Sequence, residues 1–213
     1  MKHRTAPTRR VALVVALALA ALAAFAGVAQ AKPKHKPIPM PTPKGDLVTV
    51  MSRNLYLGAD LTPAIQSTSI EGFIEANGEI LRTVDASNFP VRSKGLAKEI
   101  LEQEPDLVGL QEAALWRTGP PSILAVKSGV PVATEVKYDF LAELLKQLNK
   151  KGRTYKAVVV NPEFDFEAPA NYDGLPGGGP GPGLLQNAEI NGRLTMRDVI
   201  LARVGAGVKT SNP

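Results

Sequence analysis

The spacing of hydrophobic and polar residues alternates along the chain between the period of strands and the period of amphipathic helices. Four stretches alternate, or run apolar for a few residues between turn signals, and are predicted to be strands: 46–56, 105–112, 155–161 and 197–204. The first, DLVTVMSRNLY, is β-branched early and is predicted to end near Asn54. The second, PDLVGLQE, is an apolar run opened by proline, which is typical of a buried strand, and Glu112 is its last residue.

Three stretches carry apolar residues three and four positions apart and are predicted to be helices: 70–84, 91–104 and 138–152. The last is the most regular, with leucines at i, i+3, i+4 and i+7, lysines in its final turn and Gly152 as a stop signal. The sequence SNFP separates the first two helices, because a residue before proline is pushed out of helical geometry. Strands that alternate with amphipathic helices predict an α/β (α+β) fold.

Two longer segments are predicted to interrupt this pattern. Residues 117–135 are rich in turn-forming residues. Residues 162–183, PEFDFEAPANYDGLPGGGPGPG, are predicted to pack against nothing and to be a long surface loop or partly disordered. The glycines near its end do not match a phosphate-binding P-loop, because no Gly-Lys-Ser/Thr follows and proline removes the N–H donors that such a loop needs.

The amino-terminal end has the features of an export signal. A basic start, a long apolar run and the small-x-small tripeptide Ala29-Gln30-Ala31 predict a cleaved signal peptide over residues 1–31, with a retained membrane anchor as the rival interpretation. Residues 32–45 are rich in lysine and proline and are predicted to be an extended linker. Residues 46–213 are then a single domain in a secreted protein, with no membrane span left after cleavage, and the lack of cysteine suits an oxidising exterior. The sequence predicts no oligomeric state.

The net charge of +5 for the whole chain does not describe the folded part. Of the 25 lysines and arginines, four lie in the leader and four in the linker, which leaves 17 against 20 acidic residues and a net charge of about −3 for the domain. Basicity is therefore no argument for nucleic-acid binding. The two histidines, His3 and His35, fall in the leader and the linker, so the domain contains none.

Asn54 and Glu112 are the candidate functional residues. Both are predicted to follow the carboxyl ends of strands, where ligands of α/β sheets gather. A carboxylate and an amide supply the hard oxygen ligands that Mg²⁺ prefers, with water and substrate phosphate completing the shell. A solvated strand end or an ordinary ion pair is the alternative for Glu112, and the spacing alone does not decide between them.

The residues themselves resemble the opening of the endonuclease/exonuclease/phosphatase superfamily over roughly residues 47–204. VMSRNLY, whose strand ends in Asn54, resembles the first motif of the family, and an arginine, Arg92, lies near the start of the following helix VRSKGLAKEI. The second motif, Pro-Asp-hydrophobic-hydrophobic-x-Leu-Gln-Glu, is matched without substitution by PDLVGLQE, residues 105–112. The later strands YKAVVVN and RDVILAR are also similar to the strands that follow in the family.

The resemblance implies a four-layer α/β/β/α sandwich and a metal-dependent hydrolysis of phosphoesters, in which Glu112 binds Mg²⁺ (or Mn²⁺ or Ca²⁺) and Asn54 helps to place metal and phosphate. The substrate would be a phosphate ester carried by nucleic acid, a lipid headgroup or a sugar. The family's two histidines, its Asp-x-Asn pair and its late Asp-His pair cannot be placed, so no catalytic residue is assigned. We expect either the amino-terminal part of a longer exported enzyme, incomplete at its carboxyl end, or a shortened binding protein or inactive remnant, and the sequence favours the first.

Four further residues have a functional interpretation beside a structural one. Arg53 could contact substrate phosphate or be a solvated charge, and Asp60 could support the site or cap the following turn. Arg92 could support Glu112, although local capping or pairing is the favoured interpretation. Trp116 could line a groove, but a lone tryptophan more often packs in a core.

Overall fold

The computed structural model describes residues 47–177, 179, 183–209 and 211. The predicted leader, residues 1–31, and the predicted linker, residues 32–45, lie outside the described residues. No helix among the residues described combines the length and the apolar character needed to cross a bilayer.

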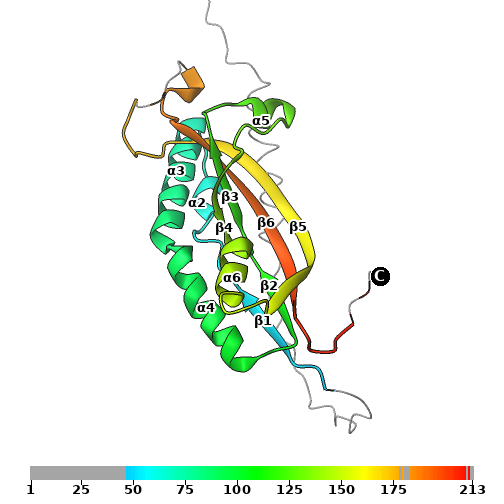
Figure 1. The fold of residues 1–213 in the computed structure, drawn as a ribbon. Helices are drawn as coiled ribbons and strands as arrows, with labels where there is room; N and C mark the ends of the chain where they lie inside the picture. Colours follow the sequence, from blue (N-terminus) through cyan, green and yellow to red (C-terminus); the bar gives the residue numbers. More distant parts are fainter. Residues whose placement is uncertain (1–46, 178, 180–182, 210, 212–213) are drawn as a thin grey trace, which may run out of the picture.

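The described residues form one mixed sheet of six strands against which helices pack (Figure 1). This confirms the general α/β class. The strands run in the spatial order β1-β2-β6-β3-β4, with β5 on the other side of β6. Their bounds are β1 Val50–Asn54, β2 Leu107–Gln111, β3 Leu115–Gly119, β4 Glu135–Asp139, β5 Tyr155–Ala170 and β6 Ile190–Arg203.

The long strand β6 holds the sheet together. Along one edge its first half pairs with β3, from Asn191 to Thr195, and its second half pairs with β2, from Val199 to Ala202. Along the other edge β5 follows it over almost its whole length. β1 adds to β2 as the parallel pair of the sheet, whereas the other pairings are antiparallel.

Helices α2, α3, α4 and α6 lie together on one side of the sheet (Figure 1). Their bounds are α2 Thr62–Ile65, α3 Ile70–Ser87, α4 Phe89–Gln103 and α6 Phe140–Leu148, and the short α5, Leu124–Ser128, lies in the connection from β3 to β4. The SNFP sequence ends α3 as predicted, but the reason given for it is wrong, because Phe89, the residue before proline, is the first residue of α4. The break is at Asn88, which takes a left-handed conformation with φ 46°. Two buried rings join α4 to α6, since Phe89 and Phe140 stack 3.7 Å apart.

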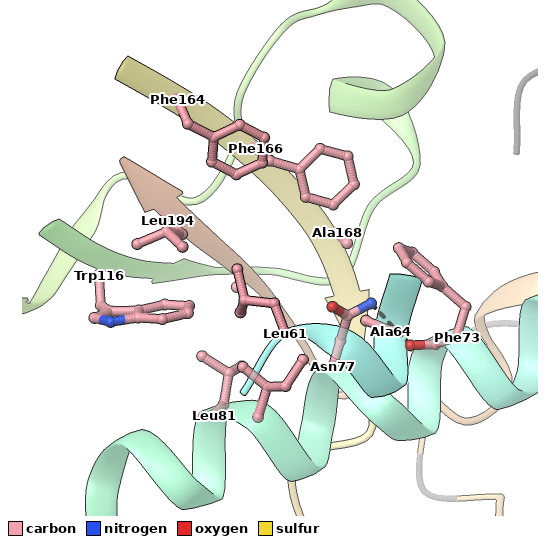
Figure 2. A pocket seen from close by; sticks show the side chains of 12 residues that line it. Leu61, Ala64, Phe73, Asn77, Leu81, Trp116, Phe164, Phe166, Ala168 and Leu194 are labelled. Carbon is pink, nitrogen blue, oxygen red and sulfur yellow. Dashed lines mark hydrogen bonds between the residues drawn. The ribbon is translucent and has the colours of Figure 1, made fainter. Parts of the chain in front are cut away.

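The expectation that residues 162–183 pack against nothing is wrong for their first half. β5 continues to Ala170, and Phe164, Phe166 and Ala168 line the space between the sheet and α3 (Figure 2). The two prolines of this strand are tolerated because β5 lies at an edge and is bulged, including between Pro162 and Phe164. The turn-rich segment 117–135 likewise contains the end of β3, all of α5 and the first residue of β4.

Candidate functional site

Asn54 and Glu112 meet at the ends of two neighbouring parallel strands. β1 and β2 pair with Asn54 opposite Gln111, and the Leu55 N–H donates a hydrogen bond of 2.9 Å to the Gln111 carbonyl. Parallel strands end at the same edge of a sheet, so the residues that end or follow them come together. The side-chain amide of Asn54 donates to Oε1 of Glu112 at 2.7 Å. The structure therefore brings together the two residues that the sequence singled out.

The carboxylate of Glu112 is held from two directions. Oε1 accepts from Nδ2 of Asn54, and Oε2 accepts from the backbone N–H of Leu57 at 2.8 Å. The amide of Asn54 is fixed in turn, because its Oδ1 accepts from the Tyr56 N–H at 2.6 Å. Asn54 is exposed and Glu112 is half-buried, so solvent reaches the pair. The two side chains are thus oriented by the backbone of residues 56 and 57.

The backbone at this site is strained on both strands. Glu112 and Tyr56 each have φ 55°, in the left-handed region that residues other than glycine seldom adopt. A conformation of this kind costs on the order of 1–3 kcal/mol, and it persists only where surrounding contacts enforce it. Strain of this sort gathers at functional sites, so the geometry draws attention to both side chains.

Arg92 holds the strained backbone that follows β1 in place. From the first turn of α4 its guanidinium donates to the carbonyl of Leu55 at 2.7 Å and to the carbonyl of Tyr56 at 3.0 Å, and its Nε donates to Ser87 at 3.1 Å. The guanidinium carbon also lies 5.0 Å from the ring centre of Phe89. Burial lowers the pKa of Arg92, and the neighbouring Tyr56 side chain partly opposes this shift. Arg92 therefore supports Glu112 indirectly, by fixing the loop whose N–H groups orient the pair.

Trp116 fixes the same loop from the sheet side. Its indole Nε1 donates a buried hydrogen bond of 2.9 Å to the carbonyl of Leu57. The N–H of the same residue, Leu57, donates to Glu112. Trp116 therefore fixes the carbonyl of a residue whose N–H orients the Glu112 carboxylate. Trp116 is buried, as expected for a packing residue, and it has this second role as well.

Arg197 holds the other side of the site, the turn after β2. Its Nε donates to the carbonyl of Ala113 at 2.8 Å, and its Nη2 pairs with Oδ1 of Asp139 at 2.6 Å. The Ala113 N–H donates back to the carbonyl of Arg197 at 2.9 Å. The turn that places Glu112 at its positive φ is therefore attached both to β6 and to the start of α6.

The donor set fits a hard cation with few protein ligands. Each oxygen of Glu112 and the Oδ1 of Asn54 uses one lone pair in the contacts above and keeps one acceptor position. Oxygens of this type suit Mg²⁺, Mn²⁺ or Ca²⁺, with water and phosphate as the remaining ligands. Within the part of the chain that the structure describes, no three or more carboxylate, imidazole or thiolate side chains gather around a common point. The protein's share is one carboxylate and one amide.

Arg53 and Asp60 are placed in structural contacts. Successive residues of a strand point to opposite faces, and the guanidinium of Arg53 forms an ion pair with Glu99 of α4. Arg53 is therefore not brought together with Glu112. Asp60 accepts from the Thr62 N–H at 2.9 Å, and hydrogen bonds from Thr62, the side-chain one first, lower the pKa of Asp60. The N-cap of α2 is Leu61, which makes no side-chain capping bond, so Asp60 binds within the turn before α2 and does not cap the helix itself.

A small apolar cavity lies between α2, α3 and the sheet (Figure 2). Its volume is about 40 Å³, far below the roughly 300–1,000 Å³ of typical ligand pockets. Phe73, Trp116, Phe166 and Leu194 are among the residues that line it, and the amide of Asn77 donates into its own helix, to Phe73, at 2.8 Å. The cavity is a packing space and not a substrate pocket.

Two residues of the site were not singled out by the sequence, Tyr56 and Arg197. Tyr56 directly follows Leu55 in the motif NLY, but nothing in the sequence signals a positive φ at a tyrosine. Arg197 opens the segment RDVILAR, which reads simply as a strand, and its contacts with the turn after Glu112 depend on pairing across 84 residues.

Comparison with family models, with curated proteins and with solved structures finds no match to this chain.

Proposed function

We propose that this chain provides the divalent-cation site of an exported phosphoester hydrolase of the endonuclease/exonuclease/phosphatase type. In this proposal Glu112 is the metal ligand, Asn54 orients it and contacts phosphate, and the sheet with its helices is one half of a four-layer α/β/β/α sandwich. The cation is Mg²⁺, with Mn²⁺ or Ca²⁺ as substitutes.

The contact between Asn54 and Glu112 is the observation that carries the proposal. The two residues are 58 positions apart in sequence, and each was selected from a separate motif of the same superfamily. Their side chains lie 2.7 Å apart at the carboxyl edge of β1 and β2. An ordinary ion pair does not explain Glu112, because both of its hydrogen-bond partners are uncharged N–H groups. A carboxylate with two neutral partners keeps its full charge for a cation.

The chemistry follows from these contacts. A divalent cation bound here would polarise a phosphoryl oxygen and lower the pKa of bound water. The chain's own contribution is to hold the Glu112 carboxylate through the N–H of Leu57 and the amide of Asn54. The second N–H of the Asn54 amide is then available to donate to a phosphate oxygen.

Electron paramagnetic resonance with Mn²⁺ tests the cation site in the full chain. We expect the free Mn²⁺ signal to fall on titration with the protein. In Glu112→Gln the affinity should fall at least about tenfold, because a neutral amide replaces the anionic ligand at nearly equal size. Glu102→Gln is the matched control, since Glu102 lies on the exposed face of α4 and pairs only with Lys98 at 3.7 Å. Equal Mn²⁺ binding by wild type and Glu112→Gln would contradict the proposal.

Turnover is expected to be a separate matter from binding. Activation of water near neutral pH usually uses histidine, and the sequence after residue 45 has none. We expect the 213-residue chain to bind Mn²⁺ without hydrolysing bis-p-nitrophenyl phosphate. Mg²⁺-dependent hydrolysis that Glu112→Ala abolishes would show that these residues suffice for catalysis, against this expectation.

A further inference from the structure

Tyr56 differs from every other aromatic residue of the described part of the chain. It is 50 % exposed, whereas the remaining tyrosines, phenylalanines and the tryptophan within residues 47–177, 179, 183–209 and 211 are buried or half-buried. An aromatic ring on the surface gives up most of the stabilisation that burial would provide. The exposure of this ring is therefore unexplained by the packing of the fold.

The backbone of Tyr56 adds a cost to that lost burial. At φ 55° a glycine would be free of steric strain, whereas a bulky residue is unfavourable. The two N–H groups that orient the site, those of Tyr56 and Leu57, require the turn but not the ring. A large side chain thus occupies a position where the backbone conformation favours glycine.

The backbone of Tyr56 is fixed beside the Asn54–Glu112 pair, and Arg92 lies over its ring. The backbone N–H of Tyr56 donates to Asn54, and its carbonyl accepts from Arg92 at 3.0 Å, so the residue is attached on both sides of its Cα. The guanidinium carbon of Arg92 lies 5.5 Å from the ring centre. A rigid aromatic surface next to a phosphate-binding position costs little entropy when a flat group stacks on it.

We propose that Tyr56 is a stacking platform for a nucleobase, so that the phosphoester bound at Glu112 is a nucleotide or the end of a nucleic-acid strand. The proposal rests on the proposed function, because the phosphate must bind at the cation site for the base to reach the ring. It names the substrate class that the resemblance left open.

Arg92 favours a neutral base over a cationic headgroup on this ring. A quaternary ammonium group is recognised by the electron-rich face of an aromatic ring. Here a guanidinium already lies near the Tyr56 ring, 5.5 Å from its centre, and would repel a second cation. A neutral nucleobase meets no such repulsion and gains stacking energy on the ring.

Isothermal titration calorimetry of the full chain with Mn²⁺ tests the platform. The probes are AMP, ribose 5-phosphate and phosphocholine, which share a phosphate and differ in what it carries. We expect AMP to bind about tenfold more tightly than ribose 5-phosphate, from the stacking of one base. Tyr56→Leu should remove this difference, whereas Tyr56→Phe should keep it.

Tyr56→Gly provides the second variant. We expect it to lose the preference for AMP while its thermal midpoint stays equal to or above that of the wild type, because glycine relieves the strain at φ 55°. A ring needed only for folding would show the reverse, with a lower midpoint. Equal affinities of wild type for AMP and ribose 5-phosphate, or tighter binding of phosphocholine, would overturn the platform.

The two proposals fail in different ways. If ribose 5-phosphate binds with Mn²⁺ and loses affinity in Glu112→Gln, the cation site stands whatever the base preference. The second case is that AMP is preferred and Tyr56→Leu removes the preference, but Glu112→Gln has no effect on the binding of any probe. The cation site is then wrong, and the platform as proposed is wrong with it, because binding of the base would not depend on a phosphate held at Glu112.

Discussion

The guanidinium of Arg92 donates a hydrogen bond of 2.7 Å to the carbonyl oxygen of Leu55, one residue beyond the end of β1. A helix residue thus fixes the peptide that follows a strand, and the neighbouring carbonyl of Tyr56 is bound by the same group. The N–H groups of the same loop, at residues 56 and 57, donate to the side chains of Asn54 and Glu112 and orient them. The geometry of the candidate site therefore depends on a residue that does not touch it.

Arg92→Met should weaken both the fold and the cation site. It leaves the carbonyls of Leu55 and Tyr56 without their charged donor, and we expect a loss of about 2–3 kcal/mol in the free energy of unfolding by urea. Mn²⁺ affinity should fall as well, because the loop no longer holds Glu112 in one orientation. Lys94→Met is the control, on an exposed position of the same helix, and should change neither quantity. Wild-type Mn²⁺ affinity in Arg92→Met would show that the loop is fixed by other contacts.

Gly78→Ala should be strongly destabilising. A Cβ at this position of α3 would lie 1.7 Å from the carbonyl oxygen of Asn171, which also accepts a hydrogen bond of 2.7 Å from Arg82. The helix and the end of β5 would have to separate, at a cost of about 2–3 kcal/mol or more. Thermal and urea unfolding measure the change.

Gly95→Ala is the matched substitution in the neighbouring helix α4. No atom lies within 4 Å of its added methyl group, so only the helix propensity changes, and we expect a gain of about 0.5–1 kcal/mol. If the two substitutions shift the urea midpoint in the same direction, the close approach of α3 to Asn171 is not rigid.

The stability of the sheet should decrease in acid through Asp106. Its carboxylate accepts from the Thr49 N–H at 2.9 Å and from Arg203 at 2.5 Å, and these contacts, the backbone one first, lower its pKa in the folded protein. A carboxyl whose pKa is lowered by folding stabilises the fold at pH values above its unfolded pKa of about 3.9. That contribution is lost as the pH falls through the folded value.

Urea unfolding of wild type and Asp106→Asn between pH 7 and pH 2.5 measures this contribution. The difference in the urea midpoint should be constant from pH 7 to about pH 5 and should shrink below the unfolded pKa of about 3.9. A difference that grew on acidification would mean that Asp106 is held protonated, contrary to its contact with Arg203.

The elements with strong periodicity could be predicted from the sequence. The two candidate residues, Asn54 and Glu112, were selected because they lie at predicted strand ends. The helix at 70–84 is observed as Ile70–Ser87, and the strand ending at Glu112 is observed as Leu107–Gln111. The first half of β5 was predicted as the strand 155–161, but the part from Pro162 onward was missed. Pro162 and Pro169 argue against a strand unless it is known to lie at an edge of the sheet. The alternation of Phe164, Phe166 and Ala168 carried the missed signal, since these residues share one face.

The contacts that fix the candidate site were beyond the reach of the sequence. Arg92 could be seen near a helix start, but its binding to the carbonyls of residues 55 and 56 depends on how α4 crosses β1. The positive φ of Tyr56 and Glu112 is imposed by tertiary contacts against the preference of both residue types. Local patterns therefore located the two candidate residues and left the orientation of their side chains open.

The position of β6 in the sheet governs when the chain can fold during synthesis. β2 and β3 do not pair with each other; each is joined to the sheet through β6, which begins 71 residues after β3 ends (190 against 119). Until that strand has left the ribosome, only local helices and the β1–β2 and β3–β4 pairs can form, and closure waits for contacts distant in sequence. The nascent chain consequently remains open, and available to chaperones, until nearly all of the described residues have been synthesised.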